Sequence, residues 1–358
     1  LACKGCKADC PVSVDMATYK AEFASRYYAG RLRPRAGYAL GRIHTWARLG
    51  SAMAPLANWV TRTPTLGGLV KRLGGIHPDR RLPPFSRPSF DRRLAARTPA
   101  ERTPPTRGDV VFWPDTFNRY FHAETAMAGV EVLERLGFRV IVPRRPLCCG
   151  RPLYDFGWLD EAKRGWRRIL AELRDPIRWQ VPVVGLEPTC VAAFRDELPN
   201  LLPDEPDART LADHTFLLAE FLDRQGDALE LPASPGPVLL HGHCHEKAVL
   251  DWPAERRVLE RLGATVATPE TGCCGMAGAF GFDARHYDVA QACGELGLLP
   301  AVREREPDAR VVANGFSCAE MIEQNTGVRA LNLAEVLHQA LVASGQPGPA
   351  HAGITANG

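Results

Sequence analysis

Residues 272–275 read Gly-Cys-Cys-Gly and residues 147–150 read Leu-Cys-Cys-Gly, so a pair of adjacent cysteines before a glycine occurs twice. The block Val-Leu-Glu-Arg-Leu-Gly precedes both pairs, at 132–137 and at 258–263. Its two copies are 126 residues apart, and the first cysteines of the pairs are 125 residues apart. This agreement indicates a tandem duplication of one domain, because a period of this length is far too long for a solenoid.

A single cysteine follows each pair, Cys190 after Glu-Pro-Thr and Cys318 after Gly-Phe-Ser. These two cysteines are 128 residues apart, in agreement with a duplication. Each comes directly after a predicted strand, and open α/β sheets bind their ligands at the carboxyl ends of the strands. We therefore expect both cysteines to face a site at the strand ends.

Strands and helices alternate within each repeat, which we place at 108–235 and 236–343. This alternation predicts an α/β fold with a parallel, doubly wound sheet in each repeat. The first repeat is predicted to have strands at 110–113, 139–143 and 181–186 and helices at 123–136 and 159–173. The second is predicted to have strands at 238–240, 264–268 and 310–313 and helices at 254–262 and 284–298.

The segment 15–107 differs from the repeats in its composition. Aromatic residues at helical spacing predict helices over 15–75, and a stretch rich in Pro and Arg predicts a linker over 78–105. The many arginines of the helical part suit either a solvated helix face or contact with an anionic membrane surface or a partner. The Ala, Gly and Pro residues of 344–358 predict a disordered tail.

The composition of the 358 residues limits the classes of protein that fit. Lys and Arg number 44 against 41 Asp and Glu, and the absence of a basic stripe interleaved with aromatics argues against nucleic-acid binding. The sequence contains no run of 18 apolar residues, so it predicts no membrane span. Eleven cysteines in clusters indicate metal binding in a reducing cytoplasm rather than a disulfide scaffold. The chain begins without Met or a signal peptide, so we expect a fragment of a longer cytoplasmic chain.

Residues 1–14 carry three cysteines, Cys3, Cys6 and Cys10, and a proline follows the last. The spacing C-x2-C-x3-C-P matches the last three cysteines of the bacterial ferredoxin run, so these three are candidate ligands of an iron–sulfur cofactor. The first cysteine of that run would come just before the first residue. We therefore expect the truncated end of a 4Fe–4S ferredoxin-like domain, whose clusters need further ligands upstream.

Four cysteines of the second repeat are candidate metal ligands: Cys244, in the His-rich stretch 241–247, and Cys273, Cys274 and Cys318. Two adjacent thiolates repel each other, so their pairing favours a bound cation. Four thiolates suit zinc or an iron–sulfur cluster.

The first repeat offers fewer thiols. The ungapped counterpart of its missing fourth cysteine is Asn118, which leaves Cys148, Cys149 and Cys190. Three thiolates can hold a cluster with a fourth ligand that is not cysteine, can hold zinc, or can hold no metal, and the sequence leaves these alternatives open.

Polar residues beside the cysteines are candidates for catalysis. His241, His243 and His245 alternate, so they cannot all face one pocket, and one of them is a candidate ligand or proton relay. Lys247 suits either the neutralisation of a reduced cluster or an ordinary surface position. We take His245 and Lys247 as the candidate catalytic pair. Cys293 is predicted to be a buried apolar cysteine of a helix.

The duplicated Cys-Cys-Gly unit resembles the cysteine-rich CCG domain of heterodisulfide reductases and of the iron–sulfur subunits of glycolate oxidase and anaerobic glycerol-3-phosphate dehydrogenase. The chain is more similar still to the C-terminal part of bacterial FAD-linked oxidases, which fuse a flavin domain, a ferredoxin-like domain and two CCG domains. The matching stretches are 3–23, 147–152, 187–190, 241–248, 272–281 and 315–318. In heterodisulfide reductases each unit ends in C-x2-C, but here Glu187 and Gly315 stand at that position, which leaves the type of cluster open.

The resemblance implies an oxidoreductase fragment that transfers electrons for a flavin-dependent D-2-hydroxyacid dehydrogenase of the glycolate, D-lactate or 2-hydroxyglutarate type. The expected cofactors are iron–sulfur clusters of the 4Fe–4S type, with zinc as an alternative at one of the two cysteine sites, and it stays open whether the first repeat binds a metal. FAD would bind to an upstream part of the chain or to a separate subunit, and a quinone or another acceptor would take the electrons. The expected location is the cytoplasm, with peripheral association at the inner face of the membrane.

Two further functions fit the same residues. The second repeat could itself be a catalytic site that reduces a heterodisulfide or a quinone, with His245 and Lys247 handling protons and charge. Alternatively, zinc at one or both cysteine sites would make the domain structural, with no redox role.

Overall fold

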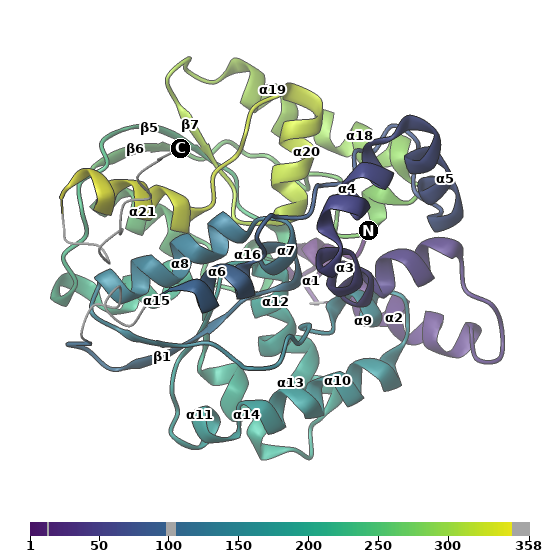
Figure 1. Cartoon of the computed structure of the whole chain (residues 1–358), viewed down its shortest axis with the longest axis horizontal. Helices are drawn as coiled ribbons and strands as arrows, with labels where there is room; N and C mark the ends of the chain where they lie inside the picture. Colours follow the sequence, from purple (N-terminus) through teal and green to yellow (C-terminus); the bar gives the residue numbers. More distant parts are fainter. Residues whose placement is uncertain (13, 98–104, 346–358) are drawn as a thin grey trace, which may run out of the picture.

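Two parallel sheets, one in each repeat, form the framework of the molecule (Figure 1). The computed structural model describes residues 1–12, 14–97 and 105–345. Helices cover both sheets, and a further group of helices from the N-terminal part of the chain packs beside them. The predicted α/β class with parallel sheets is confirmed.

The first sheet is built around one buried strand. Its strands are β1 (Asp109–Trp113), β2 (Arg139–Ile141), β3 (Val183–Gly185) and β4 (Thr215–Leu217), in the order β2-β1-β3-β4. In β1, Val111 lies opposite both Ile141 of β2 and Val183 of β3. The continuous apolar run of β1 is typical of a parallel strand that is covered on both faces. The three predicted strands are confirmed, and β4 is a fourth strand that the sequence analysis did not expect.

The second sheet repeats the first three strands. It consists of β5 (Gly236–Leu240), β6 (Ala264–Ala267) and β7 (Arg310–Val312), in the order β6-β5-β7. This order is the counterpart of β2-β1-β3, so the topology confirms the duplication seen in the sequence. At the edge that corresponds to β4, Val312 forms an isolated parallel bridge with Leu331.

Helices connect the parallel strands, as right-handed crossovers require. Those of the first repeat are α7 (Thr116–Tyr120), α8 (Ala123–Arg135), α9 (Arg151–Asp155), α10 (Leu159–Glu172), α11 (Arg174–Arg178), α12 (Pro188–Ala192), η3 (Ala193–Glu197), α13 (Leu198–Leu201), α14 (Pro206–Asp213), α15 (Leu218–Arg224) and η4 (Gly226–Ala228). Those of the second are α16 (Cys244–Val249), α17 (Pro253–Arg261), η5 (Phe280–Phe282), α18 (Tyr287–Glu295), α19 (Leu298–Glu304), α20 (Phe316–Thr326) and α21 (Leu333–Ala343). The helix predicted at 284–298 is thus shorter, because the chain leaves α18 before Gly297 and starts α19 after it.

The two repeats share one hydrophobic core. Buried residues of α8, such as Val130 and Leu133, belong to the same cluster as Leu333 and Leu337 of α21. Figure 1 shows these two helices side by side, and His338 Nε2 lies 2.7 Å from the carboxylate of Glu131 across their contact. The predicted repeat boundaries lie just before β1 and at the start of β5. Residues from both sides of the second boundary nevertheless pack into the same core.

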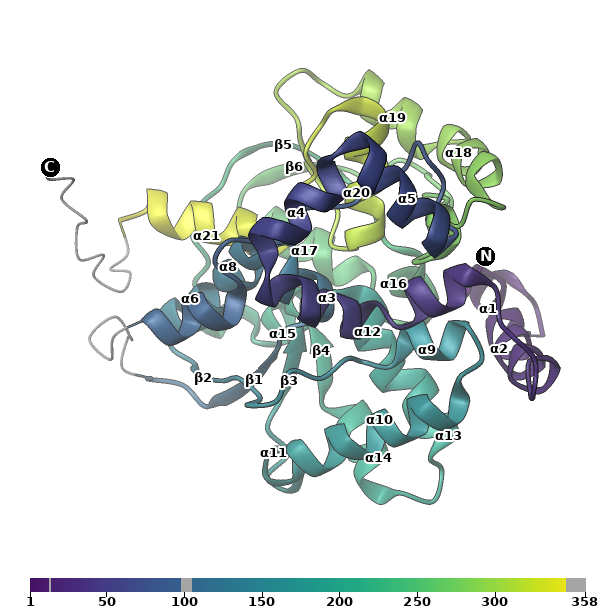
Figure 2. The ribbon, with the colours of Figure 1, turned by 45° about the vertical axis from the view of Figure 1, so that its right-hand side comes forward.

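The N-terminal region is helical, as predicted. It contains α1 (Gly5–Asp9), α2 (Met16–Tyr27), η1 (Gly37–Gly41), α3 (Ile43–Ala52), α4 (Ala54–Arg62) and α5 (Pro64–Gly74). Figure 2 shows α3, α4 and α5 lying next to one another on the outside of the molecule.

The predicted linker at 78–105 differs from the structure at one point, where α6 (Phe90–Ala96) forms. Phe90 is fully buried, and its ring lies 6.1 Å from that of Phe112 in β1, so tertiary packing fixes a helix that the local periodicity did not reveal. Part of this linker, 98–104, lies outside the described residues, as does most of the predicted tail, 346–358.

Candidate metal centre

The cysteines of the second repeat meet at the carboxyl ends of its strands. Cys244 is the first residue of α16, Cys273 and Cys274 lie in the loop after β6, and Cys318 lies in the first turn of α20. Hydrogen bonds link these thiols in series, from Cys244 through Cys273 and Cys274 to Cys318. The four candidate ligands that the sequence singles out in this repeat are therefore brought together.

Cys3 joins this group from the N-terminal segment. The Sγ atoms of Cys3, Cys244 and Cys273 all lie within 4.8 Å of one another. The sequence assigned Cys3 with Cys6 and Cys10 to a ferredoxin-like cofactor, but in the described part of the chain Cys6 and Cys10 belong to no such group of three. The pairing of Cys3 with the second repeat has no sequence signal, because it joins residues that are 241 positions apart.

Glycine allows the adjacent cysteines to turn into one site. Gly275 has φ of 87°, in the left-handed region, and a Cβ there would collide with the carbonyl oxygen of Ala290 in α18. The N–H of Gly275 also lies 3.4 Å from the sulfur of Cys273, to which it donates. The turn therefore needs glycine both for its backbone conformation and for the close approach of α18.

The first repeat has the same kind of glycine turn after its cysteine pair. Gly150 has φ of 84°, and the indole of Trp166 packs against it and donates from Nε1 to the carbonyl of Cys149 at 2.7 Å. The sulfurs of Cys149 and Cys190 are 2.9 Å apart, and Cys148 forms a hydrogen bond with Cys149. The three predicted thiols of this repeat are brought together as well.

The first repeat has polar side chains where the second repeat has its fourth cysteine. The ungapped match of Cys244 with Asn118 is wrong, because Thr116 begins α7 as Cys244 begins α16. Asn118 donates from its side-chain amide to Asp115 at 2.7 Å. Asp115 also accepts from the backbone N–H groups of Phe117 and Asn118, so both residues serve to cap α7. The hydroxyl of Thr116 forms a hydrogen bond with Cys148 instead. Three thiols and a hydroxyl are a weaker donor set for a soft metal than the four thiols of the second repeat.

The environment of both sites raises the pKa of most of the thiols in the absence of a cation. Cys273 is an exception, because its hydrogen bond with Cys244 lowers its pKa. The hydrogen bond with Cys149 and burial raise the pKa of the Cys148 thiol well above its usual range. Hydrogen bonds with Cys273 and Cys3, together with burial, raise the pKa of Cys244. The bond with Cys149 lowers the pKa of Cys190, but burial outweighs it and raises that pKa to about 12. A bound metal would reverse these shifts, because only its positive charge can offset several buried thiolates.

Buried carboxyl groups lie near the thiols. Burial raises the pKa of Glu187 to about 7 and that of Glu246 to about 8. Glu187 caps α12 by accepting from Thr189 N and also accepts from the backbone N–H of Phe316 in the second repeat. It therefore connects the two cysteine sites structurally, a role that its place in Glu-Pro-Thr-Cys does not reveal.

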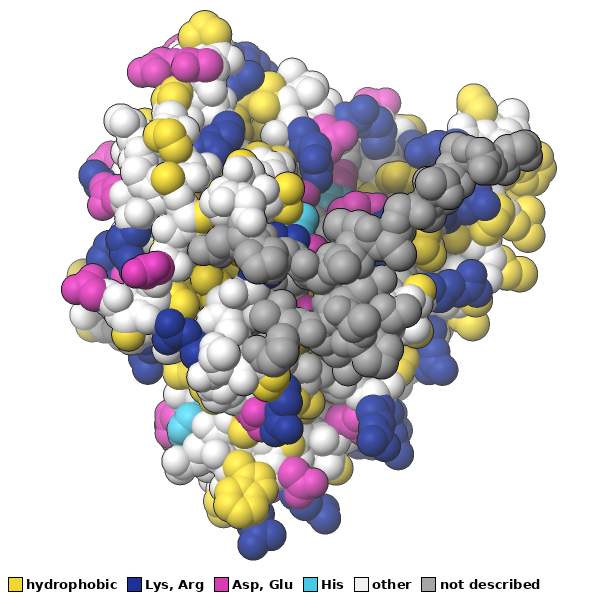
Figure 3. Space-filling model, turned by 60° about the vertical axis from the view of Figure 1, so that its left-hand side comes forward, with side chains coloured by type: hydrophobic (Ala, Val, Ile, Leu, Met, Phe, Trp, Pro, Cys, Tyr) yellow, Lys and Arg dark blue, Asp and Glu magenta, His cyan; other side chains and the backbone are white. Residues whose placement is uncertain are grey.

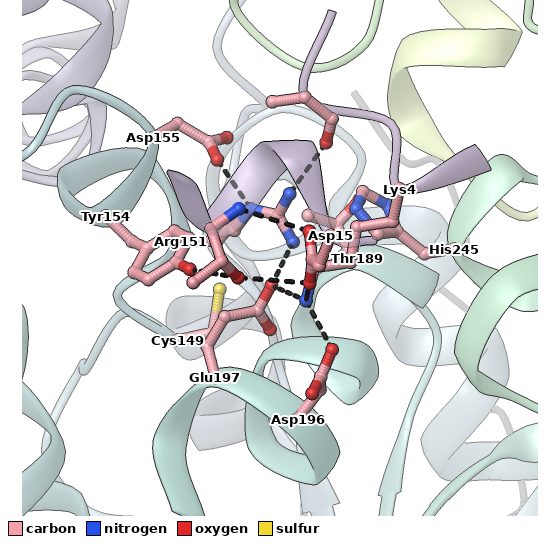
Figure 4. Close-up of polar contacts among 12 residues, drawn as sticks. Lys4, Asp15, Cys149, Arg151, Tyr154, Asp155, Thr189, Asp196, Glu197 and His245 are labelled. Atoms are coloured by element: carbon pink, nitrogen blue, oxygen red, sulfur yellow. Dashed lines mark hydrogen bonds and ion pairs between the residues drawn. The ribbon is translucent and has the colours of Figure 1, made fainter. Parts of the chain in front are cut away.

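An ion network holds the N-terminal segment in place (Figure 4). Lys4 is 1% exposed and pairs with Asp15, Asp196 and Glu197. The guanidinium of Arg151 binds Asp155 and Glu197, and it donates to the carbonyl of Ala2 at 2.7 Å.

This network explains the position of Cys3. Figure 4 shows the charged groups of the N-terminal segment, α9 and η3 converging between the two repeats, close to Cys149 and His245. Buried charges that have lost a partner are strongly destabilising, so the network fixes the segment on α9 and η3 of the first repeat. No sequence signal points to it, because Lys4, Arg151 and Glu197 form no motif.

The candidate catalytic residues occupy different environments. His245 is buried, its ring stacks on that of His243 with centroids 5.0 Å apart, and burial lowers its pKa. Lys247 is exposed, with Nζ 5.6 Å from the ring of Trp252. His243 caps α16 by accepting from His245 N, and Nδ1 of His241 lies 2.6 Å from the hydroxyl of Thr271. The catalytic assignment of His245 and Lys247 stays a prediction.

The prediction for Cys293 is wrong. This cysteine is half-buried on α18 rather than buried, because the face of the helix that packs inward carries Ala290 and Gly294. Its thiol lies close enough to Cys273 for a thiolate there to raise its pKa, after the larger effect of burial.

Comparison with known proteins agrees with the duplicated architecture. The family model described as "Cysteine-rich domain", CCG, matches residues 110–195 and 239–323. D-2-hydroxyglutarate dehydrogenase of Pseudomonas putida is 29% identical over 95% of this chain and 34% of its own length. One of the subunits of the anaerobic glycerol-3-phosphate dehydrogenase of Escherichia coli is 28% identical over 85% of this chain and 76% of its own length.

A third relative has a higher sequence identity than these two, over a shorter stretch. Lactate utilization protein A of Bacillus subtilis is 32% identical over 45% of this chain and 69% of its own length. The chain spans about a third of the length of the D-2-hydroxyglutarate dehydrogenases that it matches. The two matched domains, the thiols at their strand ends and these relatives together show that the chain belongs to the family of proteins built on paired cysteine-rich CCG domains.

Proposed function

We propose that this chain is the electron-transfer part of a flavin-linked dehydrogenase that oxidises a D-2-hydroxy acid. The observation that carries the proposal is a series of thiols at the second repeat. The Sγ atoms of Cys3, Cys244 and Cys273 lie within 4.8 Å of one another, and hydrogen bonds continue the series through Cys274 to Cys318. The names of two relatives support the substrate class, since 2-hydroxyglutarate and lactate are 2-hydroxy acids, whereas glycerol 3-phosphate shares only the oxidisable hydroxyl group.

The donor set fits an iron–sulfur cluster, which supplies a centre that takes up and releases single electrons. Cys244, Cys273, Cys274 and Cys318 would hold it in the second repeat. Cys148, Cys149 and Cys190 would hold a second group, either another cluster with a ligand that is not cysteine or zinc. Burial of Cys149, Cys190, Cys274 and Cys318 keeps water away from the sulfur atoms.

The chain's residues suggest a direction for the electrons. Cys3, Cys6 and Cys10 would belong to the entry clusters. The ion network around Lys4 and Arg151 anchors this segment on the first repeat, and Cys3 reaches the thiols of the second. FAD would bind to a dehydrogenase domain upstream or to a separate subunit. A quinone is the acceptor that we favour.

We also propose peripheral association with an anionic membrane, at the inner face and on the cytoplasmic side. None of the helices in the described ranges is both long and apolar enough to span a bilayer. Residues 23–78, however, contain nine Lys and Arg and no Asp or Glu. Helices α3–α5 in this segment also expose large apolar side chains, namely Trp46, Leu49, Met53, Leu56, Trp59, Leu69, Val70 and Leu73. On the face in Figure 3, by contrast, basic and acidic side chains are interspersed.

The test of the electron-transfer role is the metal content of the chain purified without oxygen. We expect iron and sulfide, and an electron paramagnetic resonance signal that changes on reduction. Cys274→Ser should abolish the signal of the second repeat, because it removes a buried thiol from the middle of the series. Cys293→Ser is the matched control, since that thiol is half-buried and lies outside the series, and it should keep the signal.

Zinc alone, with no signal in either redox state, would overturn the proposal and make the domain structural. A signal that survives Cys274→Ser unchanged would contradict the assignment of the ligands. Slower turnover of the Lys247→Ala variant with an intact signal would instead favour the alternative, a catalytic reducing site in the second repeat.

A further inference from the structure

A large apolar cavity of about 710 Å³ lies between the N-terminal helices and the two repeats. Its inner end is formed by Cys148, Cys149 and Cys190, so it reaches the thiols of the first repeat rather than those of the second. Phe117 and Phe316, whose rings stack with centroids 4.2 Å apart, form part of its wall at the junction of the repeats.

The outer end of the cavity belongs to the helical segment. The lining residues that are exposed to solvent, in the described part of the chain, are Arg35, Tyr38, Trp46, Val70 and Leu73, on or beside η1, α3 and α5. These helices also carry the exposed apolar side chains that we assign to the membrane surface. A molecule that enters the cavity would therefore arrive from an apolar and basic surface.

The chemistry of the lining restricts the ligand. Most of the wall is aliphatic or aromatic. Its polar groups include the hydroxyls of Thr116, Thr189 and Ser317 and the carboxyl groups of Glu187 and Asp155. Arg151 also borders the cavity, but its guanidinium is engaged by Asp155, Glu197 and Ala2. Such a wall suits an apolar ring with a few hydrogen-bonding oxygens, and its volume is in the range of pockets for small organic ligands.

We propose that this cavity binds the quinone ring of a lipid-soluble electron acceptor, with the ring next to Cys148, Cys149 and Cys190 and an apolar tail leading out between η1, α3 and α5. The inference rests on the proposed electron-transfer function and assigns the place of its last step. There, a quinone takes up two protons from water and the two electrons that are released when the hydroxy acid is oxidised to a keto acid, and it becomes a quinol. Electrons enter at the thiols near Cys3 and leave at the other repeat.

The positions of the two repeats support this direction of electron transfer. The second repeat holds the entry side, because the Sγ atom of Cys3 lies within 4.8 Å of those of Cys244 and Cys273. The first repeat holds the exit side, because the apolar cavity ends on its cysteines. Glu187 spans the two sites through its bond to Phe316 N, which keeps the cavity walls of both repeats in register.

The test is photoaffinity labelling of the whole chain, loaded with its metal, by an azido-benzoquinone with a decyl chain. Labels should map to peptides that contain η1, α3 or α7, and an excess of unlabelled decyl-benzoquinone should displace them. Ala39→Phe, which puts a ring into the cavity, should lower this labelling at least tenfold. Ala52→Phe makes the same change at an exposed position of α3 outside the cavity and should leave labelling unchanged.

Ile43→Trp provides a second filling variant if Ala39→Phe does not fold, since Ile43 also lines the cavity. Labels outside the cavity, or labelling that neither filling variant lowers, would overturn the inference. If the metal signal behaves as proposed and an acceptor is still reduced, the electron-transfer function survives that failure. If the quinone labels the cavity but the chain holds only zinc, the assignment of the cavity as a quinone site is supported and the proposed electron-transfer function is refuted.

Discussion

At the scale of single residues, the two glycines of the cysteine turns decide whether the thiols can meet. Gly150 and Gly275 both lie in the left-handed region, and both leave room for a neighbour, the indole of Trp166 in the first repeat and the backbone of α18 in the second. A side chain at either position would push apart the elements that carry the cysteines. The glycines therefore act on metal binding without being ligands.

Replacement of Gly275 by Ala should lower the free energy of unfolding and weaken metal binding in the second repeat. The backbone conformation alone costs roughly 1–2 kcal/mol for a residue with a Cβ, and the collision with Ala290 adds to it. Gly263→Ala is the matched control, because Gly263 has φ of 81° but a Cβ there meets no atom within 4 Å.

Denaturant titration and iron content of the two variants check this prediction. Gly263→Ala should show only the backbone cost and keep its iron, whereas Gly275→Ala should lose more stability and part of its iron. Equal stability and equal iron content in both variants would show that the approach of α18 does not matter.

At the scale of elements, helices α3–α5 combine features that rarely occur together on a water-exposed surface. Trp59 is 59% exposed and Leu56 is 51% exposed, yet the segment 23–78 carries no acidic residue. Each large apolar side chain that leaves water contributes about 1.5–3 kcal/mol, and each Lys or Arg near an anionic bilayer contributes about 1 kcal/mol. Together these contributions favour docking of this face on a membrane.

Vesicle sedimentation tests the docking face. The wild-type chain should bind vesicles that contain phosphatidylglycerol, less at high salt, and bind phosphatidylcholine alone weakly. The double variant Leu56→Glu, Trp59→Glu should lower binding by at least about tenfold, because it removes two inserted side chains and adds negative charge. Trp179→Glu removes a tryptophan that is 72% exposed elsewhere and should have no effect. Equal binding of all three proteins would refute a bilayer contact at α3–α5.

At the scale of the whole molecule, the two repeats behave as one folding unit in their packing. One hydrophobic cluster contains residues of β1 and α8 as well as residues of β5 and α21. Bonds between the repeats, from Glu187 to Phe316 and from Glu131 to His338, accompany this core. Units that share a core lose their packing together, so cooperative unfolding is the expectation.

The substitution Leu337→Ala should therefore shift the unfolding of both repeats. Leu337 is fully buried in the shared core, and its truncation should cost about 2–5 kcal/mol. Six of the seven tryptophans lie outside the second repeat, where Trp252 stands, so fluorescence mainly follows the rest of the molecule. We expect one transition, moved to lower denaturant by the same amount in fluorescence and in circular dichroism. Val342→Ala, at an exposed position of the same helix, should move it little. Separate transitions for the two signals would show independent repeats.

The sequence by itself determined the duplication, the parallel sheets and the cysteines of each repeat. These features are local or periodic: buried parallel strands are short apolar runs, and the cysteine turns need a glycine at a fixed position. The ungapped match of Asn118 with Cys244 was wrong, because the stretch from the start of α7 or α16 to the block Val-Leu-Glu-Arg-Leu-Gly differs in length between the repeats, and Thr116 stands at that place.

Only the tertiary structure decided the position of Cys3, the buried state of Lys4 and Arg151, the helix α6 and the cavity that ends on Cys148. Each depends on contacts between residues far apart in the chain, whose energies come from burial and charge pairing and leave no periodic trace in the sequence. Cys293 is a further example. Gly294, the next residue on the same helix, is buried, whereas Cys293 is half-buried, and only the packing of the helix decides this difference.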